Sequence, residues 1–141
     1  MAMLKKILAP TDFSELSAEG VRYACHLAKD VGAQIIVMNV IILDETNTTA
    51  KGEVEAHKTR LGEFVTKTVP HRADLKVREV VVAGQPYNAI IDCATNEHVD
   101  LVVMSSHGRS GLSRMLIGSV TDKLLRAAKC PVLVVPVHAK G

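Results

Sequence analysis

A glycine- and serine-containing segment in the last third of the chain has the residue types that could hold a phosphate group. The segment follows a short apolar run, residues 101–104, and passes through Gly108 and Arg109 to Gly118 and Ser119. Small residues let backbone N–H groups approach phosphate oxygens closely, and an arginine can neutralise their charge. A helix that begins at Ser119 would add unpaired N–H groups and a partial positive charge. The segment therefore predicts a phosphate site.

Two well-known phosphate-binding patterns are absent from this segment, which has neither Gly-Lys-Ser/Thr nor Gly-x-Gly-x-x-Gly. A structural interpretation is also open. It assigns Gly108 and Gly111 to turns and makes Ser119 the N-cap of the last helix, with Asp122 three residues on as its capping partner. Both interpretations use the same helix end, so capping and phosphate binding are compatible.

The elements that must position this segment alternate between apolar and amphipathic stretches. The run Gln34 to Ile42 is apolar on both faces, which is typical of a parallel strand covered by helices on each side. Strands are expected at 4–9, 34–42, 75–83, 101–104 and 132–135, and helices at 14–31, 53–68, 86–98 and 119–129. This alternation predicts an α/β fold, a three-layer sandwich with a five-stranded parallel sheet. Residues 1–141 show no internal repeat and no linker, so we expect one domain.

Ligands of such a sheet bind at the C-terminal ends of its strands, where the strand order reverses. Asp12, which follows the first strand, could equally be a turn or cap residue of the helix that begins near Ser14. The candidate binding residues are therefore those that follow the expected strands: Pro10, Thr11 and Asp12, then Val40 and Ile41, then Ala83 to Gln85, and the segment from Met104 onward.

The histidines and the loop arginine have their own alternatives. We interpret His107, in the predicted loop, as a solvated side chain rather than a phosphate or metal ligand, and Arg109 could likewise be a solvated loop charge. No catalytic residue and no metal site is assigned. The remaining histidines are scattered without the spacing of metal ligands and receive no role: His26, His57, His71, His98 and His138.

Composition and the pattern of apolar residues exclude some kinds of binding partner for the protein. The net charge is only +2 and aromatic residues make up 3%, with no Trp, so neither a basic surface nor a stacking platform for nucleic acid is expected. The longest apolar stretch, 35–43, is less than half a membrane span, and the start of the chain lacks the apolar run of a signal peptide. Cys25, Cys93 and Cys130 form no CxxC pair. We therefore expect a cytoplasmic protein with reduced thiols that binds neither nucleic acid nor membranes.

The phosphate segment resembles the nucleotide-binding branch of the universal stress protein family, whose pattern is G-x2-G-x9-G-[ST]. Here the pattern reads Ser105-x2-Gly108-x9-Gly118-Ser119, with serine in place of the first glycine. The resemblance extends over the full length of the chain. Its other parts are residues 7–12 (ILAPTD), 84–86 (GQP), 106–111 (SHGRSG) and 130–136 (CPVLVVP).

The resemblance implies a Rossmann-like fold, similar to that of the adenine nucleotide alpha hydrolases, with strand order 3-2-1-4-5. It implies a small regulatory protein of the stress response that binds ATP or another adenine nucleotide, with or without Mg²⁺. Asp12 would contact the ribose or adenine side of the nucleotide, and Val40 would hold adenine. The phosphates would be surrounded by Gly108, Arg109, Gly118, Ser119 and Val120, with Met104 and Ser105 along the wall between base and phosphates, and Pro10 and Thr11 completing the site.

Ser105 is the one departure from the family pattern. If the position requires a positive φ, serine costs about 1 kcal/mol relative to glycine. If the position requires only a small side chain, the change is close to neutral. We therefore expect nucleotide binding to survive, and to be weakened only in the first case.

The apolar run at the end of the chain predicts an edge strand, which invites pairing with another chain. Residues 132–137 are therefore expected to form a homodimer interface, whose extent Pro136 limits, and the family resemblance implies the same assembly. Two other functions stay open. One is a nucleotide-free dimerisation or adaptor module. The other is a slow ATPase with at most weak hydrolysis, since no Walker B pattern accompanies the glycine segment. The sequence identifies no other protein partner.

Overall fold

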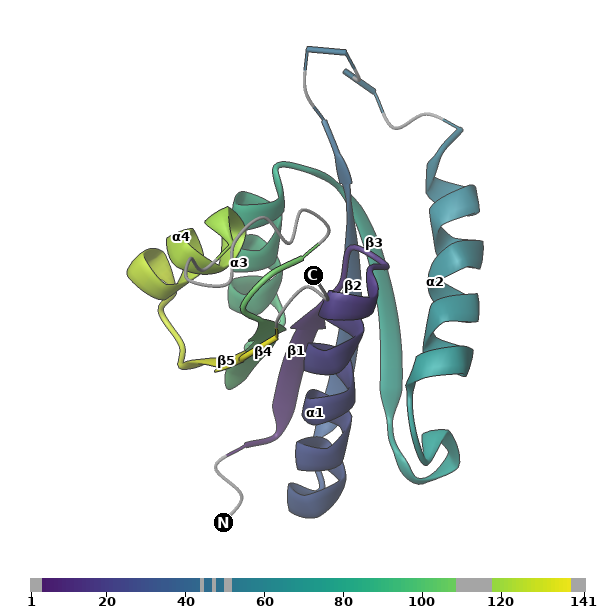
Figure 1. The fold of residues 1–141 in the computed structure, drawn as a ribbon, viewed down its shortest axis with the longest axis vertical. Coiled ribbons are helices and arrows are strands. Elements are labelled where there is room, and N and C mark those ends of the chain that lie inside the picture. The colour runs from purple at the N-terminus through teal and green to yellow at the C-terminus, as the bar shows by residue number, and fades with distance from the viewer. Residues whose placement is uncertain (1–3, 44, 47, 50–51, 109–117, 138–141) are drawn as a thin grey trace.

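A central sheet lies between two layers of helices (Figure 1). The structure is a computed structural model that describes residues 4–43, 45–46, 48–49, 52–108 and 118–137. The strands are β1 (Lys6–Pro10), β2 (Gln34–Ile42), β3 (Val77–Gly84), β4 (Leu101–Ser105) and β5 (Val132–Val135). The helices are α1 (Glu15–Val31), α2 (Val54–Thr68), α3 (Pro86–Asn96) and α4 (Ser119–Ala127), with a short 3₁₀ turn at Arg72–Asp74.

The strands are hydrogen-bonded in the order β3-β2-β1-β4-β5, and each of these pairs is parallel. The predicted α/β fold and its strand order are therefore confirmed. β1 lies in the middle, with Ile7 opposite Ile35 of β2 and Leu8 opposite Val102 of β4. The chain proceeds outward from β1 in one direction through β2 and β3, and in the other through β4 and β5. The order thus reverses between β1 and β4, which places a binding crevice at the C-terminal ends of these strands.

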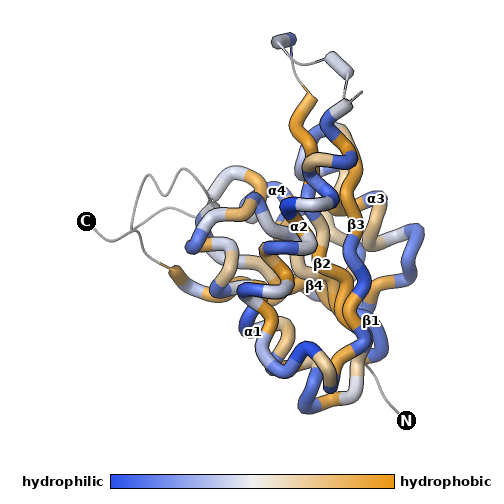
Figure 2. The backbone as a smooth tube through the Cα atoms, turned by 90° about the vertical axis from the view of Figure 1, so that its right-hand side faces the viewer, coloured by the Kyte–Doolittle hydropathy of each residue, from blue (hydrophilic) through white to orange (hydrophobic). Residues whose placement is uncertain are grey.

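Apolar side chains cover both faces of the sheet, as the run 34–42 predicts. Ile7 and Ile35 pack on the face covered by α1 and α2. Leu8 and Ile36 pack on the opposite face, under α3 and α4. Successive residues of a strand point to opposite faces, so the central strands contribute to two cores. Figure 2 shows these strands as hydrophobic stretches inside a more polar outer layer.

Several element ends differ from the expected boundaries by one or two residues. β1 begins at Lys6 rather than Leu4. β3 begins at Val77 rather than Leu75, because the 3₁₀ turn occupies the approach to the strand. α3 ends at Asn96 because His98 has a left-handed φ of 53°. α4 ends at Ala127 because Ala128 is already extended, and Pro131 disfavours helical backbone at the residue before it. Within the described residues, no helix is both long and apolar enough to cross a membrane.

Asp100 ties the start of β1 to the start of β4. Its Oδ2 accepts hydrogen bonds from the backbone N–H groups of Lys5, at 2.9 Å, and Lys6, at 3.0 Å. These two bonds hold the pKa of the Asp100 carboxyl below its usual value. A carboxyl with a lower pKa in the folded state stabilises the fold above its unfolded pKa of about 3.9. That contribution disappears as the pH falls through the folded value.

We expect Asp100→Asn to lower the melting temperature at neutral pH, and we expect this difference to disappear as the pH falls through the lowered pKa of the folded carboxyl, because the native side chain then becomes neutral itself. The measurement is the melting temperature of both proteins as a function of pH. Asp92→Asn, at an exposed position of α3, is the matched control and should show no such divergence. Curves that stay parallel throughout for Asp100→Asn would contradict the assigned role of the two backbone bonds.

Candidate functional site

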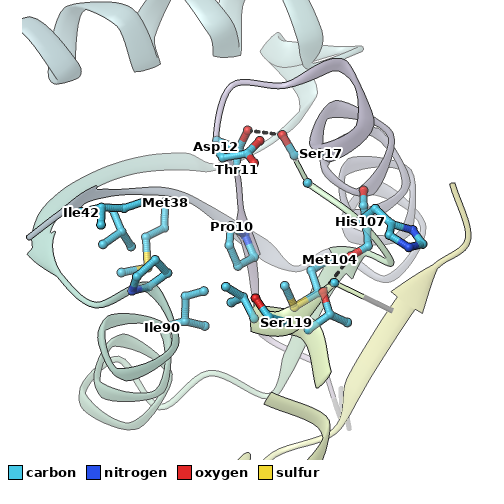
Figure 3. Close-up of a pocket in the computed structure, with 17 residues that line it drawn as sticks. Pro10, Thr11, Asp12, Ser17, Met38, Ile42, Ile90, Met104, His107 and Ser119 are labelled. Atoms are coloured by element: carbon cyan, nitrogen blue, oxygen red, sulfur yellow. Dashed lines mark hydrogen bonds between the residues drawn. The ribbon is translucent and has the colours of Figure 1, made fainter. Parts of the chain in front are cut away.

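A pocket with a volume of about 240 Å³ opens at the C-terminal ends of β1, β2 and β4, beside the N-termini of α3 and α4 (Figure 3). The volume is close to the lower end of the ~300–1,000 Å³ typical of small-molecule sites. Arg109 lies outside the described residues. The candidates Ile41 and 83–85, which were named only because they follow strands, do not line this pocket. The other residues that the resemblance assigns to the site all line it: Pro10, Thr11, Asp12, Val40, Met104, Ser105, Gly108, Gly118, Ser119 and Val120.

The pocket has an apolar end that the sequence analysis identified only in part. Val40 was predicted, but its neighbours on the same face of β2, Met38 and Ile42, also line the cavity. The period of two along a strand could have found them. Pro86 and Ile90 contribute from the first turns of α3, at the i, i+4 spacing of one helix face. Figure 3 shows Met38, Ile42 and Ile90 together on one side of the cavity.

The opposite end is formed by the start of α4. Gly118, rather than Ser119, is the N-cap, and no side chain among the described residues caps the helix. The Gly118 N–H donates to Ser106 O at 2.7 Å, which brings the two ends of the phosphate segment together. The side chain of Asp122 pairs with Arg126 at 3.3 Å instead of capping. The capping alternative for Ser119 and Asp122 is therefore wrong, and the helix end faces the pocket with its first N–H groups available to an anion.

Asp12 and Gly108 are in close contact in the pocket that the N-terminus of α4 also lines. A Cβ at Gly108 would be 2.5 Å from Asp12 Oδ2, so only glycine fits beside the carboxylate as it stands. The other carboxylate oxygen, Oδ1, accepts the N–H of Ser14 at 3.0 Å. Ser14 itself is the N-cap of α1, because its Oγ accepts the Ser17 N–H at 3.1 Å. Asp12 is therefore both a turn residue and a carboxylate that borders the pocket.

The hydroxyl of Ser105 is used inside the protein rather than in the pocket. Its Oγ donates to Leu16 O at 2.6 Å and accepts the N–H of Gly20 at 2.9 Å. Leu16 and Gly20 are four residues apart in α1, the spacing at which a regular helix joins a carbonyl oxygen directly to an N–H group. The Ser105 hydroxyl therefore lies between these two backbone groups. Ser105 is not among the described residues with a positive φ. The alternative with a backbone penalty is therefore excluded, and the serine links β4 to α1.

His107 is not solvated, contrary to the expectation from the sequence. Its exposed fraction is 8%, and its Nδ1 lies 3.1 Å from Ser106 Oγ. The hydrogen bonding of β4 continues past its end, because the Ser106 N–H donates to Val135 O at 2.9 Å. Ser106 Oγ also accepts the Val137 N–H at 3.0 Å. Ser106 is thus held along the residues at and after the end of β5, and His107, directly after it, is buried. The small residues around it gave no sign of this strand-like path in the sequence.

Two further polar residues of the pocket were missed, Ser17 and Thr121. Ser17 Oγ lies 2.7 Å from Thr11 Oγ1, a contact drawn as a dashed line in Figure 3. Thr121 Oγ1 donates to Ser105 O at 3.0 Å and so fastens the first turn of α4 to the end of β4. Within the described residues, no group of three or more His, Cys, Asp or Glu side chains could hold a metal ion.

Comparison with known proteins assigns the family. The model of the universal stress protein family matches residues 3–136. The chain belongs to this family. The universal stress protein MJ0531 of Methanocaldococcus jannaschii is 34% identical over 140 residues, which cover 94% of this chain and 82% of the relative.

Solved structures agree with the family assignment. The structure of MJ0577, a universal stress protein of the same archaeon, is 30% identical with a TM-score of 0.76, over 98% of this chain and 99% of that one. A universal stress protein in complex with cAMP is 25% identical with a TM-score of 0.70, over 97% of this chain and 98% of that one. This universal stress protein therefore shares its whole architecture with relatives of similar length.

Proposed function

We propose that this universal stress protein binds an adenine nucleotide, foremost ATP, in the pocket at the ends of β1, β2 and β4, and acts as a regulatory protein. The observation that carries the proposal is the pairing of an apolar end with an uncapped helix N-terminus in one cavity. A nucleotide needs both, because its base is apolar and flat while its phosphates are anionic. The relative solved with cAMP supports an adenine nucleotide as the ligand class.

The proposed roles follow from the two ends of the pocket. Val40, with Met38 and Ile42 beside it, packs on the base. Asp12 accepts hydrogen bonds from the sugar hydroxyls, because an ionised carboxylate has two acceptor oxygens and no donor. The phosphates lie at the start of α4, between Gly108 and the backbone N–H groups from Ser119 onward. Arg109 keeps its predicted role of neutralising phosphate charge, and Mg²⁺ is an accompanying ion of the phosphates.

We also propose that the protein is a homodimer that pairs through β5. The strand lies at an edge of the sheet, and all four of its apolar residues are only half-buried. Of the predicted interface 132–137, the strand covers 132–135, and Val137 turns inward to Ser106. An unpaired apolar edge of this kind is stabilised by a second strand. The proposal predicts a dimer mass in solution, measured by light scattering.

The test of nucleotide binding starts from freshly purified protein. Bound nucleotide is released by denaturation and resolved by anion exchange, and the stripped protein is titrated with ATP by calorimetry. At 100 times the dissociation constant, ATP is expected to stabilise the fold by about 2.7 kcal/mol. No heat and no change in melting temperature at millimolar ATP would sink the proposal and leave the nucleotide-free adaptor.

Two substitutions at Ser119 locate the phosphates. Ser119→Asp adds a carboxylate at the helix end, which favours the helix but repels a phosphate, so ATP affinity should fall about tenfold or more without loss of stability. Ser119→Asn is the neutral variant of the same size and should fall much less. Equal losses in the two variants would show that size rather than charge matters, and the phosphates would then lie elsewhere.

A further inference from the structure

Phe13, between β1 and α1, has a backbone conformation that bulky side chains rarely adopt. Its φ is 70°, in the left-handed region that glycine occupies readily. Such a conformation persists only where the surroundings hold it, and residues of this kind gather at functional sites. Contacts from outside the loop must therefore fix Phe13, and Asp12 is the residue directly before it.

Besides its packing against the hydrophobic core, the ring of Phe13 makes two aromatic contacts and one cation–π contact with α2. Its centroid lies 6.0 Å from that of His57 and 5.9 Å from that of Phe64, the latter edge-to-face. The guanidinium carbon of Arg60 lies 4.3 Å from the centroid, over the face of the ring, which is an attractive cation–π geometry. His57 and Phe64 are two helical turns apart, so α2 holds the ring along a substantial part of its length.

A second connection joins α2 to the other side of Asp12. Asn39 of β2 is buried, and its Nδ2 donates to Thr11 O at 3.0 Å. Its Oδ1 lies 2.9 Å from His57 Nδ1. Because an amide oxygen only accepts, the Nδ1 of His57 carries the proton and donates it to Asn39. α2 is thus joined to Thr11 through Asn39 and to Phe13 directly.

Hydrogen bonds among Thr11, Phe13 and Ser14 fix the carboxylate of Asp12. The Phe13 N–H donates to Thr11 Oγ1 at 3.0 Å, and the next N–H, of Ser14, donates to Asp12 Oδ1 at 3.0 Å. The loop is a chain of short turns with little freedom of its own. Among the described residues, none of α2 lines the pocket. α2 reaches the residues on either side of Asp12 through the contacts of Phe13 and Asn39.

We propose that α2 sets the position of the Asp12 carboxylate through Phe13 and Asn39, which makes Phe13 a positioning residue of the nucleotide pocket. This inference rests on the proposed function and adds to it an element that lies outside the cavity. A change in the packing of α2 alters nucleotide affinity without touching the ligand.

The first test is a double-mutant cycle of ATP affinity with Asp12→Ala and Phe13→Ala. Phe13→Ala is expected to weaken ATP binding about tenfold in the presence of Asp12, and less than about twofold in the Asp12→Ala protein. An equal loss in both backgrounds would overturn the inference, because a residue that only stabilises the fold acts regardless of Asp12.

A second pair of variants covers the case in which Phe13→Ala does not fold. Arg60→Gln removes the cation over the ring, and Lys58→Gln changes an exposed lysine of the same helix that pairs with Glu55 instead. ATP affinity should fall about fivefold in the first variant and stay unchanged in the second. Equal affinities in the two variants would overturn the inference.

A third measurement needs no nucleotide and separates this inference from the proposed function. The amide proton of Ser14 is held by Asp12 Oδ1, so its hydrogen exchange reports how firmly the carboxylate is fixed. Exchange should be about fivefold faster in Arg60→Gln and unchanged in Lys58→Gln. If ATP does not bind, the proposed function fails, while equal exchange rates in the two variants would still reject the role of α2.

Discussion

The substitution Gly20→Ala will lower the free energy of unfolding by about 2–3 kcal/mol, although alanine is the better helix former by about 1 kcal/mol. A Cβ at position 20 would lie 2.7 Å from both the backbone nitrogen and the Oγ of Ser105. Either α1 moves away from β4 or the Ser105 hydroxyl leaves its place between Leu16 and Gly20. Both responses lose buried contacts and hydrogen bonds, which outweighs the gain in helix propensity. The measurement is chemical unfolding of the purified variant.

Gly62→Ala provides the matched control, because the same change occurs in the interior of another helix. A Cβ at Gly62 meets only Glu79 Oε1, at 3.5 Å, which is ordinary contact. This variant should gain up to about 1 kcal/mol. In a Ser105→Gly background, Gly20→Ala should cost less, since the hydroxyl clash is gone and only the backbone contact remains. Stabilisation by both single substitutions would show that β4 and α1 are not closely packed here.

The second large effect concerns the pocket and not the fold. Gly108→Ala should weaken ATP binding about tenfold or more while lowering the free energy of unfolding by about 1 kcal/mol or less. The added Cβ would lie 2.5 Å from Asp12 Oδ2, so the carboxylate has to move, which weakens the bond that its Oδ1 accepts from the Ser14 N–H. This movement takes the carboxylate from its place in the cavity.

The Asp12→Ala protein is the control for this effect. Once the carboxylate is absent, Gly108→Ala has nothing to displace, and its further effect on ATP affinity should be less than about twofold. Calorimetric titration and chemical unfolding of the four proteins complete the measurement. A large loss of stability with unchanged affinity would show instead that position 108 serves the backbone of the loop.

The elements of the fold could be predicted because local periodicity specifies each of them. The strand 34–42 was predicted at its observed boundaries, and α1 was predicted to within one residue, since Ser14 and Gly32 mark its two ends. Periodicity carries no information on the order of the strands, which the family resemblance supplied instead. Boundaries failed where a left-handed residue such as His98, or an extended residue such as Ala128, ended a helix early.

The candidate site could be predicted where topology alone decides. Residues that follow parallel strands must gather at one edge of the sheet, so Asp12, Val40 and Gly108 were found from their positions. Burial of His107 and the two bonds of Ser105 depend instead on how closely one layer packs on another. Ser105 contacts α1 across 89 residues of sequence, and no local pattern encodes that depth of packing.

The contact between Ser105 and α1 also has a consequence for the order in which these two positions could change during evolution. A hydroxyl at 105 requires the space left by glycine at 20, so the glycine must have been present before the serine could be accepted. Replacement of Gly20 meets the backbone nitrogen of residue 105 at 2.7 Å whatever the side chain there, and the two bonds of the serine add to this cost. The glycine is in this sense entrenched, and ancestral reconstructions of the family should place it earlier than the serine.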